Sequence, residues 1–269
     1  MSGGECVGWL PRSLLCVLRS LFAGGTTAGA AIAGGADTAQ QARLTCDGVT
    51  IPAAALAIVG NATTVGPQTG GFLTLFPADA ARPLAASSNY SANQIVNAPF
   101  TVGLSASGQF KIYSFATTGL VIDVLGYFSA EASDVNGARL LFNALSKPVR
   151  LLETRAGLTG CFAPGAAING DSVFNQQARG QCNGETIPPA ALAVTGNVTV
   201  VNSNGGFLTL WPSNATQPTV ATSNFNVGQV FNRHFTVGLG TTGTDAGAFK
   251  LYSRFTTDVV IDLSGYFAP

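Results

Sequence analysis

The chain repeats itself, and this duplication is the feature that most limits how it can fold. The stretch Val121–Phe128 returns almost unchanged as Val260–Phe267, and each copy closes one half of the sequence. Upstream, Gln40–Arg43 matches Gln176–Arg179 at an offset of 136 residues. Self-similarity over such a distance indicates that one folding unit occurs twice. With 269 residues, the chain is long enough for two domains that each bury a core.

Short strands are the secondary structure that the two halves predict. Phe207–Trp211 and Phe249–Ser253 are rich in aromatic and aliphatic residues that partly alternate with polar ones. Clusters of turn-forming residues, such as Ser203–Gly206, interrupt the sequence at short intervals. Many short strands between turns are typical of sandwiches and barrels. We therefore predict an all-β protein with two tandem antiparallel β-sandwich domains, jelly-roll-like in architecture.

The repeat also predicts where the domains begin and end. Module one is expected over residues 1–128, although its first strand, within 1–27, matches module two poorly. A polar linker is expected over 129–139, because this segment combines acidic residues with Ser, Asn and Gly. Module two then fills residues 140–269.

The apolar segment near the N-terminus, Leu14–Phe22, has several interpretations. Arg19 interrupts it, and it is too short for a membrane span. Signal cleavage near Ala28–Ala33 would remove residues that align with module two, so we expect the segment to be retained. The longer apolar stretch Trp9–Phe22 can then fill an open sheet edge, either in its own module or as a strand donated to a neighbouring subunit. The residues predicted for this assembly strand are Leu14, Leu15, Val17 and Leu18.

Charge is scarce, and this excludes several classes of partner. Only 10% of the residues are charged, and 13 basic residues balance 13 acidic ones. A neutral chain has no field that attracts nucleic acid or anionic lipid. At 46% hydrophobic residues the chain is not disordered, so its surface must be polar but largely uncharged. Such a surface offers little repulsion between molecules, and we expect self-association into a homo-oligomer or filament.

The five cysteines favour disulfides over metal binding. No Cys-x-x-Cys pair occurs and the chain has one histidine, so no metal site and no cofactor are expected. Twenty residues lie between Cys161 and Cys182, and a bridge there would stabilise module two by roughly 3 kcal/mol. Cys46 keeps the place of Cys182 in module one, with Cys16 or Cys6 as its partner. An odd total leaves one thiol free or available for an intermolecular bond.

No set of residues points to catalysis, and the chain is not expected to be an enzyme. His234 is the one candidate base for a hydrolytic triad, and module one has Pro99 at the matching place. Asp123 and Asp262 lie within apolar strands, where an unpaired carboxylate is costly. Because neither has a second acid beside it, we expect structural rather than catalytic or metal-binding roles. The expected partners are Arg43 or Lys111 in module one, Arg179 or Lys250 in module two, or backbone amides.

Two further kinds of residue recur at equivalent positions. Asn61 and Asn197 start equivalent strands, where a buried turn or ladder role is expected. Phe76 and Trp211 follow equivalent strand patterns and belong either to the core or to a solvent-exposed platform that stacks on sugars. The apolar neighbours of these aromatic residues favour the core, and the platform is the alternative.

Four motifs together carry a resemblance to a known kind of module. They are Arg150–Arg155, Gly196–Val201, Gly206–Pro212 and Gly265–Pro269. With these motifs the chain resembles a β-rich repeat module of secreted and cell-surface proteins of environmental bacteria. The resemblance implies a β fold and an extracellular or cell-surface location in a bacterium, and it implies no activity.

These observations lead to one functional prediction and one alternative. We predict a non-enzymatic extracellular structural protein, a subunit of a surface layer, fibre or appendage. The alternative is a carbohydrate-binding or adhesion module, with a glycan as its partner.

Overall fold

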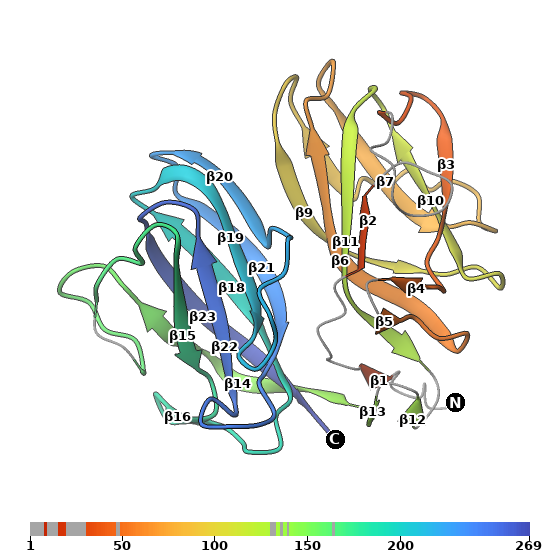
Figure 1. Cartoon of the computed structure of the whole chain (residues 1–269). Coiled ribbons are helices and arrows are strands. Elements are labelled where there is room, and N and C mark those ends of the chain that lie inside the picture. The colour runs from red at the N-terminus through yellow and green to blue at the C-terminus, as the bar shows by residue number, and fades with distance from the viewer. Residues whose placement is uncertain are drawn as a thin grey trace. The chain divides into compact units, whose positions relative to one another are not determined.

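The structure is a computed structural model that describes residues 8–9, 16–19, 31–46, 49–129, 133–134, 137–138, 140–162 and 165–269. The regular elements of these residues are all strands, and among them is no helix that could cross a membrane. These described residues divide into two compact units, the second of which lies within Leu140–Pro269. We call them module one and module two and describe each by itself. Figure 1 shows both as layered strands.

Module two is a sandwich of two four-stranded sheets. Its first sheet has the order β14-β23-β18-β21 and its second the order β15-β22-β19-β20, and all neighbours are antiparallel. If the eight strands of the two sheets are numbered along the chain, the first sheet has the order one, eight, three, six, which is a jelly-roll arrangement. The strands are β14 (Leu141–Glu153), β15 (Ser172–Gln177), β18 (Ala193–Val201), β19 (Asn204–Pro212), β20 (Ser223–Val227), β21 (Phe231–Gly238), β22 (Ala248–Ser253) and β23 (Asp258–Ala268).

Module one has the same strand order. Its first sheet is β1-β11-β6-β9, with β2 also paired to β11, and its second is β3-β10-β7-β8. The duplication in the sequence is thus a duplication of fold, and the predicted all-β, jelly-roll-like class is confirmed. The strands are β1 (Gly8–Trp9), β2 (Cys16–Arg19), β3 (Asp37–Gln41), β6 (Ala55–Val65), β7 (Gly71–Pro77), β8 (Ser88–Tyr90), β9 (Val96–Gly103), β10 (Gln109–Ser114) and β11 (Gly119–Ser129).

Short strand pairs complete the structure. β16 (Gly180–Cys182) and β17 (Glu185–Ile187) form a hairpin in module two. Its turn is Asn183-Gly184, and both residues have positive φ, as a tight hairpin turn requires. β4 (Thr45–Cys46) pairs with β5 (Val49–Thr50) at the corresponding place in module one. β12 (Ser133–Asp134) and β13 (Gly137–Ala138) pair within the segment that was expected to be a linker.

The alternation of side chains along the strands places one apolar core inside each sandwich. In module two, the core takes Val198 and Val200 from β18, and β19 adds Leu208 and Leu210. Each core contains a pair of neighbouring aromatic rings. The ring centroids of Phe235 and Phe249 are 6.2 Å apart in module two, and those of Phe100 and Phe110 are 6.5 Å apart in module one.

A close backbone approach in the first sheet of each module requires a glycine. The register between β18 and β23 shifts directly before Gly196, which marks a β-bulge. A Cβ atom on Gly196 would lie 2.0 Å from the backbone oxygen of Asp262. Gly60 of β6 has the same place in module one, where its Cβ would lie 2.1 Å from the oxygen of Asp123. Any other residue must push these two central strands apart.

The predicted assembly strand pairs within its own module. Val17 and Leu18 belong to β2, which pairs antiparallel with β11. Leu14 and Leu15 lie outside the described residues. The sequence predicts that this segment pairs either within its own module or with a neighbouring subunit. The backbone pairing of β2 is the first of these.

Candidate functional site

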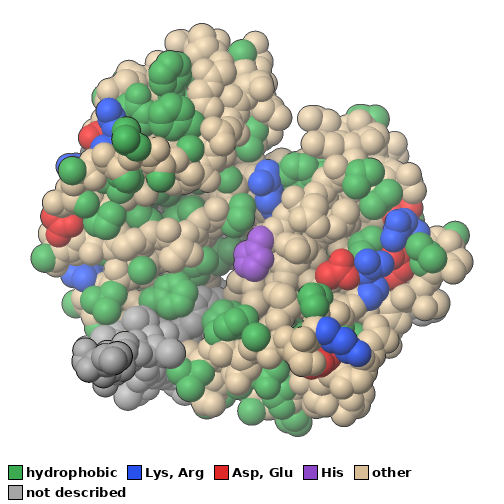
Figure 2. Space-filling view, turned by 180° about the vertical axis from the view of Figure 1, so that it is seen from behind, with side chains coloured by type: hydrophobic (Ala, Val, Ile, Leu, Met, Phe, Trp, Pro, Cys, Tyr) green, Lys and Arg blue, Asp and Glu red, His purple; other side chains and the backbone are tan. Residues whose placement is uncertain are grey.

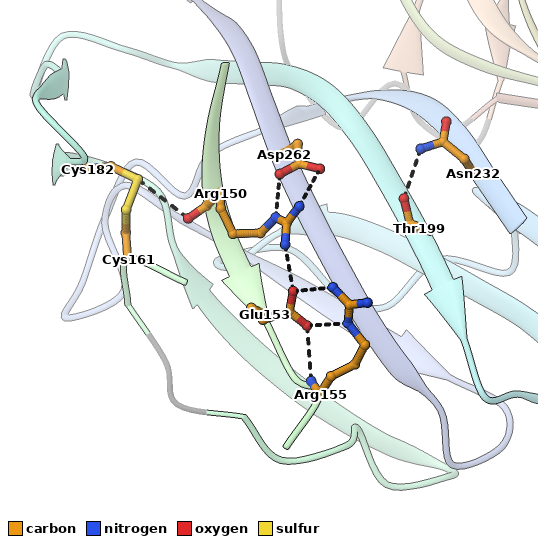
Figure 3. A network of polar contacts seen from close by, with 8 residues as sticks. All are labelled: Arg150, Glu153, Arg155, Cys161, Cys182, Thr199, Asn232 and Asp262. Atoms are coloured by element: carbon orange, nitrogen blue, oxygen red, sulfur yellow. Dashed lines mark hydrogen bonds and ion pairs between the residues drawn. A yellow bond between two sulfur atoms is a disulfide. The ribbon is translucent and has the colours of Figure 1, made fainter. Parts of the chain in front are cut away.

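A buried carboxylate organises the polar end of β14 in module two. Glu153 is the last residue of this strand, and its side chain is closed to solvent. Its Oε2 accepts hydrogen bonds from Arg150 Nη1 at 2.6 Å and from Arg155 Nη2 at 2.7 Å. Its Oε1 accepts from the Nε of Arg155 at 2.8 Å and from the backbone N of Arg155 at 3.1 Å. Figure 3 shows the carboxylate held between the two guanidinium groups.

Arg150 extends these contacts to the neighbouring strand. Its Nε donates to Oδ1 of Asp262 at 2.5 Å, and its Nη2 lies 3.5 Å from Oδ2. Arg150 and Asp262 are register partners on β14 and β23, so their side chains leave the sheet on the same face. Two positive and two negative side chains thus form one chain of contacts. We call Arg155, Glu153, Arg150 and Asp262 the ion network.

The electrostatics of the ion network keep Glu153 ionised. Hydrogen bonds from Arg155 hold the pKa of Glu153 at about 2, below its usual 4.5, against the opposing effect of burial. The hydrogen bond to Asp262 raises the pKa of Arg150, and that to Glu153 raises the pKa of Arg155. A carboxylate with so low a pKa is poorly suited to carry protons near neutral pH. The arrangement can hold β14 and the chain after it in place.

We expect the free energy of unfolding to fall as the pH drops from about 4.5 to about 2. Glu153 binds a proton less readily in the folded state, so protons favour the unfolded state across this range. The loss is at most about 3 kcal/mol. Solvent screening reduces it, because the arginine side chains are 36–37% exposed. Urea unfolding of the wild type and of Glu153→Gln between pH 7 and pH 2 measures this loss in the free energy of unfolding. Parallel pH dependences of the two proteins would contradict the expectation.

Cys161 and Cys182 form a disulfide beside the ion network (Figure 3). Their Cα atoms are 5.3 Å apart. Cys182 lies on β16 within the core cluster, and the backbone N of Cys161 lies 3.1 Å from the carbonyl oxygen of Arg150. The bridge thus ties the segment after the ion network to the hairpin β16–β17. The side chains of Cys16 and Cys46 lie outside the described part of the chain, and their pairing stays a prediction.

Removing this disulfide is expected to destabilise module two by about 3 kcal/mol, because the open chain gains freedom when it unfolds. The measurement is urea unfolding of Cys161→Ser/Cys182→Ser and of the wild type, each with and without reductant. The unfolding of module two should lose stability on reduction in the wild type and should not respond to reductant in the variant. Equal midpoints for oxidised wild type and variant would contradict a stabilising role.

The two strand aspartates differ from each other, and Asp262 differs from the prediction that both are buried. Asp123 is buried, as expected. Asp262 is 34% exposed and pairs with Arg150, so the predicted partners Arg179 and Lys250 are wrong. The reason is geometric: Asp262 points away from the core, to the face on which its register partner Arg150 lies.

Arg43 and Arg179 bind backbone instead of carboxylates. Arg43 donates from Nε and Nη2 to the carbonyl oxygen of Ala55, at 2.9 and 2.8 Å. Arg179 donates from Nε to that of Ala191, at 2.9 Å. Both arginines are half-buried rather than buried. Each fastens the turn that leads into the central strand of its module.

The predicted burial of the paired asparagines is correct for one of them. Asn61 is buried, whereas Asn197 is exposed. On β18 the neighbouring Val198 belongs to the core, so Asn197 must point to the opposite, outer face of the sheet.

Trp211 is closed to solvent, which excludes its predicted alternative role as a ligand-facing aromatic. Its exposed fraction is 2%. Residues 213–222 cross the outer face of β19 and cover the ring. The indole Nε1 donates to the carbonyl oxygen of Ala215 at 3.2 Å, and Thr209 Oγ1 donates to that of Val220 at 2.5 Å.

Phe76 is covered in the same way, and its alternative role is equally wrong. Its exposed fraction is also 2%. Thr74, two residues earlier on β7, donates from Oγ1 to the carbonyl oxygen of Ala85 at 2.8 Å, which holds residues 78–87 over the strand. Neither module therefore presents this aromatic position to a sugar.

The described residues do not bring His234 into a catalytic arrangement. Its Nε2 lies 3.1 Å from the hydroxyl of Thr195, and burial lowers the pKa of the imidazole. Within the described ranges, no group of three or more His, Cys, Asp or Glu side chains could hold a metal ion. Among the described residues, the ion network joins four charged side chains, of which the sequence predicted a structural role only for Asp262. The signal was available in the alternating charges of Arg150–Arg155.

Comparisons with known proteins give no family. No protein-family model and no curated protein match the sequence. The crystal structure of the STIV MCP matches with a TM-score of 0.25 and 9% identity, over 89% of this chain and 94% of that chain. The tandem CBM22-1–CBM22-2 domain of Xyn10C from Paenibacillus barcinonensis matches with a TM-score of 0.23 and 9% identity, over 98% and 100%. TM-scores this low support no inference about fold or function. The jelly-roll assignment depends on the strand order alone.

Proposed function

We propose that the protein is a non-enzymatic extracellular structural protein of a bacterial surface, a subunit of a surface layer, fibre or appendage that assembles through its β-sandwich modules. The observation that carries this proposal is the set of large apolar side chains exposed on module two. Val227 and Phe255 flank the adjacent residues Gly205 and Gly206, and Val230 is exposed nearby in the chain. Apolar side chains gathered on a surface mark sites of protein association.

The weakly charged surface supports the same proposal. On the face shown in Figure 2, charged side chains are few, and positive and negative groups often lie together. The net charge is zero, so copies of the chain do not repel one another over long distances. Association then depends on apolar contact, shape and hydrogen bonding.

The extracellular part of the proposal is supported by the disulfide. Bridges such as Cys161–Cys182 form and persist in oxidising compartments. The resemblance of the sequence motifs to secreted repeat modules agrees with this location.

The carbohydrate-binding alternative has lost the feature on which it depended. It needed Phe76 and Trp211 to face solvent, and both are covered by the segments that follow their strands. No other observation favours a glycan over a protein partner.

The test is the state of the purified chain in solution. Sedimentation velocity and negative-stain electron microscopy over a range of concentrations should show filaments or sheets. A species of 27.3 kDa at every concentration would contradict the proposed function.

A further inference from the structure

The second sheet of module two ends on both sides in a strand without charge. β15 reads Ser-Val-Phe-Asn-Gln-Gln and β20 reads Ser-Asn-Phe-Asn-Val. Val173 on β15 is 49% exposed, and Val227 on β20 is 75% exposed. Edge strands of soluble proteins are ordinarily protected from pairing with other chains by lysine, proline, inward-pointing charges or bulges. Neither strand contains lysine, proline or any charged residue.

The first sheet of the same module has protected edges. Its edge strand β14 contains Lys147, Pro148 and Arg150, and its register against β23 is irregular between Ala144 and Val149. The opposite edge, β21, contains Arg233. One module thus protects one sheet and leaves the other open. Low overall charge does not explain this difference, because both sheets belong to the same short sequence.

The directions of the two open strands fit each other. Each neighbour in the order β15-β22-β19-β20 is antiparallel, and an even number of strands leaves β15 and β20 running in opposite directions. A second copy shifted without rotation therefore brings its β15 beside β20 of the first in antiparallel orientation. The same step repeats without closing, because the contact joins two different surfaces.

We propose that β20 of one copy pairs with β15 of the next, so that the second sheets of module two form one continuous antiparallel sheet along a fibre. This inference rests on the proposed function and adds which two strands meet and in which direction they run. Backbone hydrogen bonds provide the affinity of such strand addition. Val173 and Val227 lose contact with water as the edges meet. No charge opposes the approach on either strand.

The test uses two single variants, Val173→Lys and Val227→Lys. Each places a charge on one edge and leaves the other edge intact. Because both substituted side chains are exposed, the fold should persist, and near-UV circular dichroism checks this. Each variant alone should remain at 27.3 kDa under conditions in which the wild type assembles. Mixed in equal amounts, they should form a dimer and stop there, since one usable β20 meets one usable β15.

A control variant carries two added positive charges elsewhere, one more than either edge variant. Leu158→Lys/Asn214→Lys alters two exposed loop positions of module two and should assemble like the wild type. If the wild type assembles and the edge variants assemble equally well, or their mixture stays monomeric, the strand contact is wrong and the proposed function stands. If the wild type does not assemble, the proposed function fails, and the strand contact fails with it.

Discussion

Replacing Gly196 with alanine is expected to destabilise module two by about 4 kcal/mol or more, because the added methyl group collides with backbone rather than with a movable side chain. The new Cβ would lie 2.0 Å from the backbone oxygen of Asp262 on the adjacent central strand. Relief requires the two strands to separate or to change register, which breaks hydrogen bonds in the middle of the first sheet. Urea unfolding followed by tryptophan fluorescence measures the change.

Module one provides a second instance and a control. Gly60→Ala should have a similar effect, since its Cβ would lie 2.1 Å from the oxygen of Asp123. Gly70→Ala should have little effect, because the nearest atom to its new Cβ is 3.7 Å away. If Gly196→Ala and Gly60→Ala cost no more than Gly70→Ala, the close approach at the bulge is not required.

Replacing Glu153 with alanine is the second change with a large expected effect, a loss of about 3 kcal/mol in the free energy of unfolding. The substitution leaves Arg150 and Arg155 without the carboxylate that both contact, and removing one partner from a buried ion pair is strongly destabilising. Glu153→Gln should cost less, because an amide oxygen still accepts one of the hydrogen bonds. Urea unfolding at pH 7 measures the free energy of unfolding of the wild type, Glu153→Ala and Glu153→Gln.

The matched control is an exposed ion pair in the same module. Arg254 Nη1 lies 2.5 Å from Asp171 Oδ1, and both side chains are largely exposed. Asp171→Asn should change stability little, since exposed pairs contribute little and asparagine tolerates the positive φ of this position. A Glu153→Ala variant that unfolds together with Asp171→Asn would show that burial gives the ion network no special weight.

The fold could be predicted from the sequence because the evidence for it is local and occurs twice. Strand patterns such as Phe207–Trp211 recur at equivalent places in both halves, so errors in reading one copy are corrected by the other. The alternation of Val198 and Val200 with polar residues likewise follows from a period of two. These signals need no knowledge of which strands meet.

The ion network could not be predicted in this way, because its partners are brought together by the sheet. Arg150 and Asp262 are 112 residues apart and meet because β14 pairs with β23. The register shifts between Arg150 and Leu152, so counting along the strand does not identify the partner. The burial of Trp211 agrees with the core placement that its apolar neighbours favour. The contact of its indole Nε1 with the carbonyl oxygen of Ala215 could not be predicted, because the residues after β19 are polar and show no strand pattern.

The jelly-roll order has a mechanical consequence for any assembly in which the chain is under tension. The C-terminal strand β23 lies between β14 and β18, so a pull on the C-terminus along this strand loads two hydrogen-bonded ladders in shear. In module two the contact of Arg150 with Asp262 adds a cross-link on one side. This side-chain contact adds to the resistance of the backbone ladder between β14 and β23 when module two is pulled from its C-terminal strand.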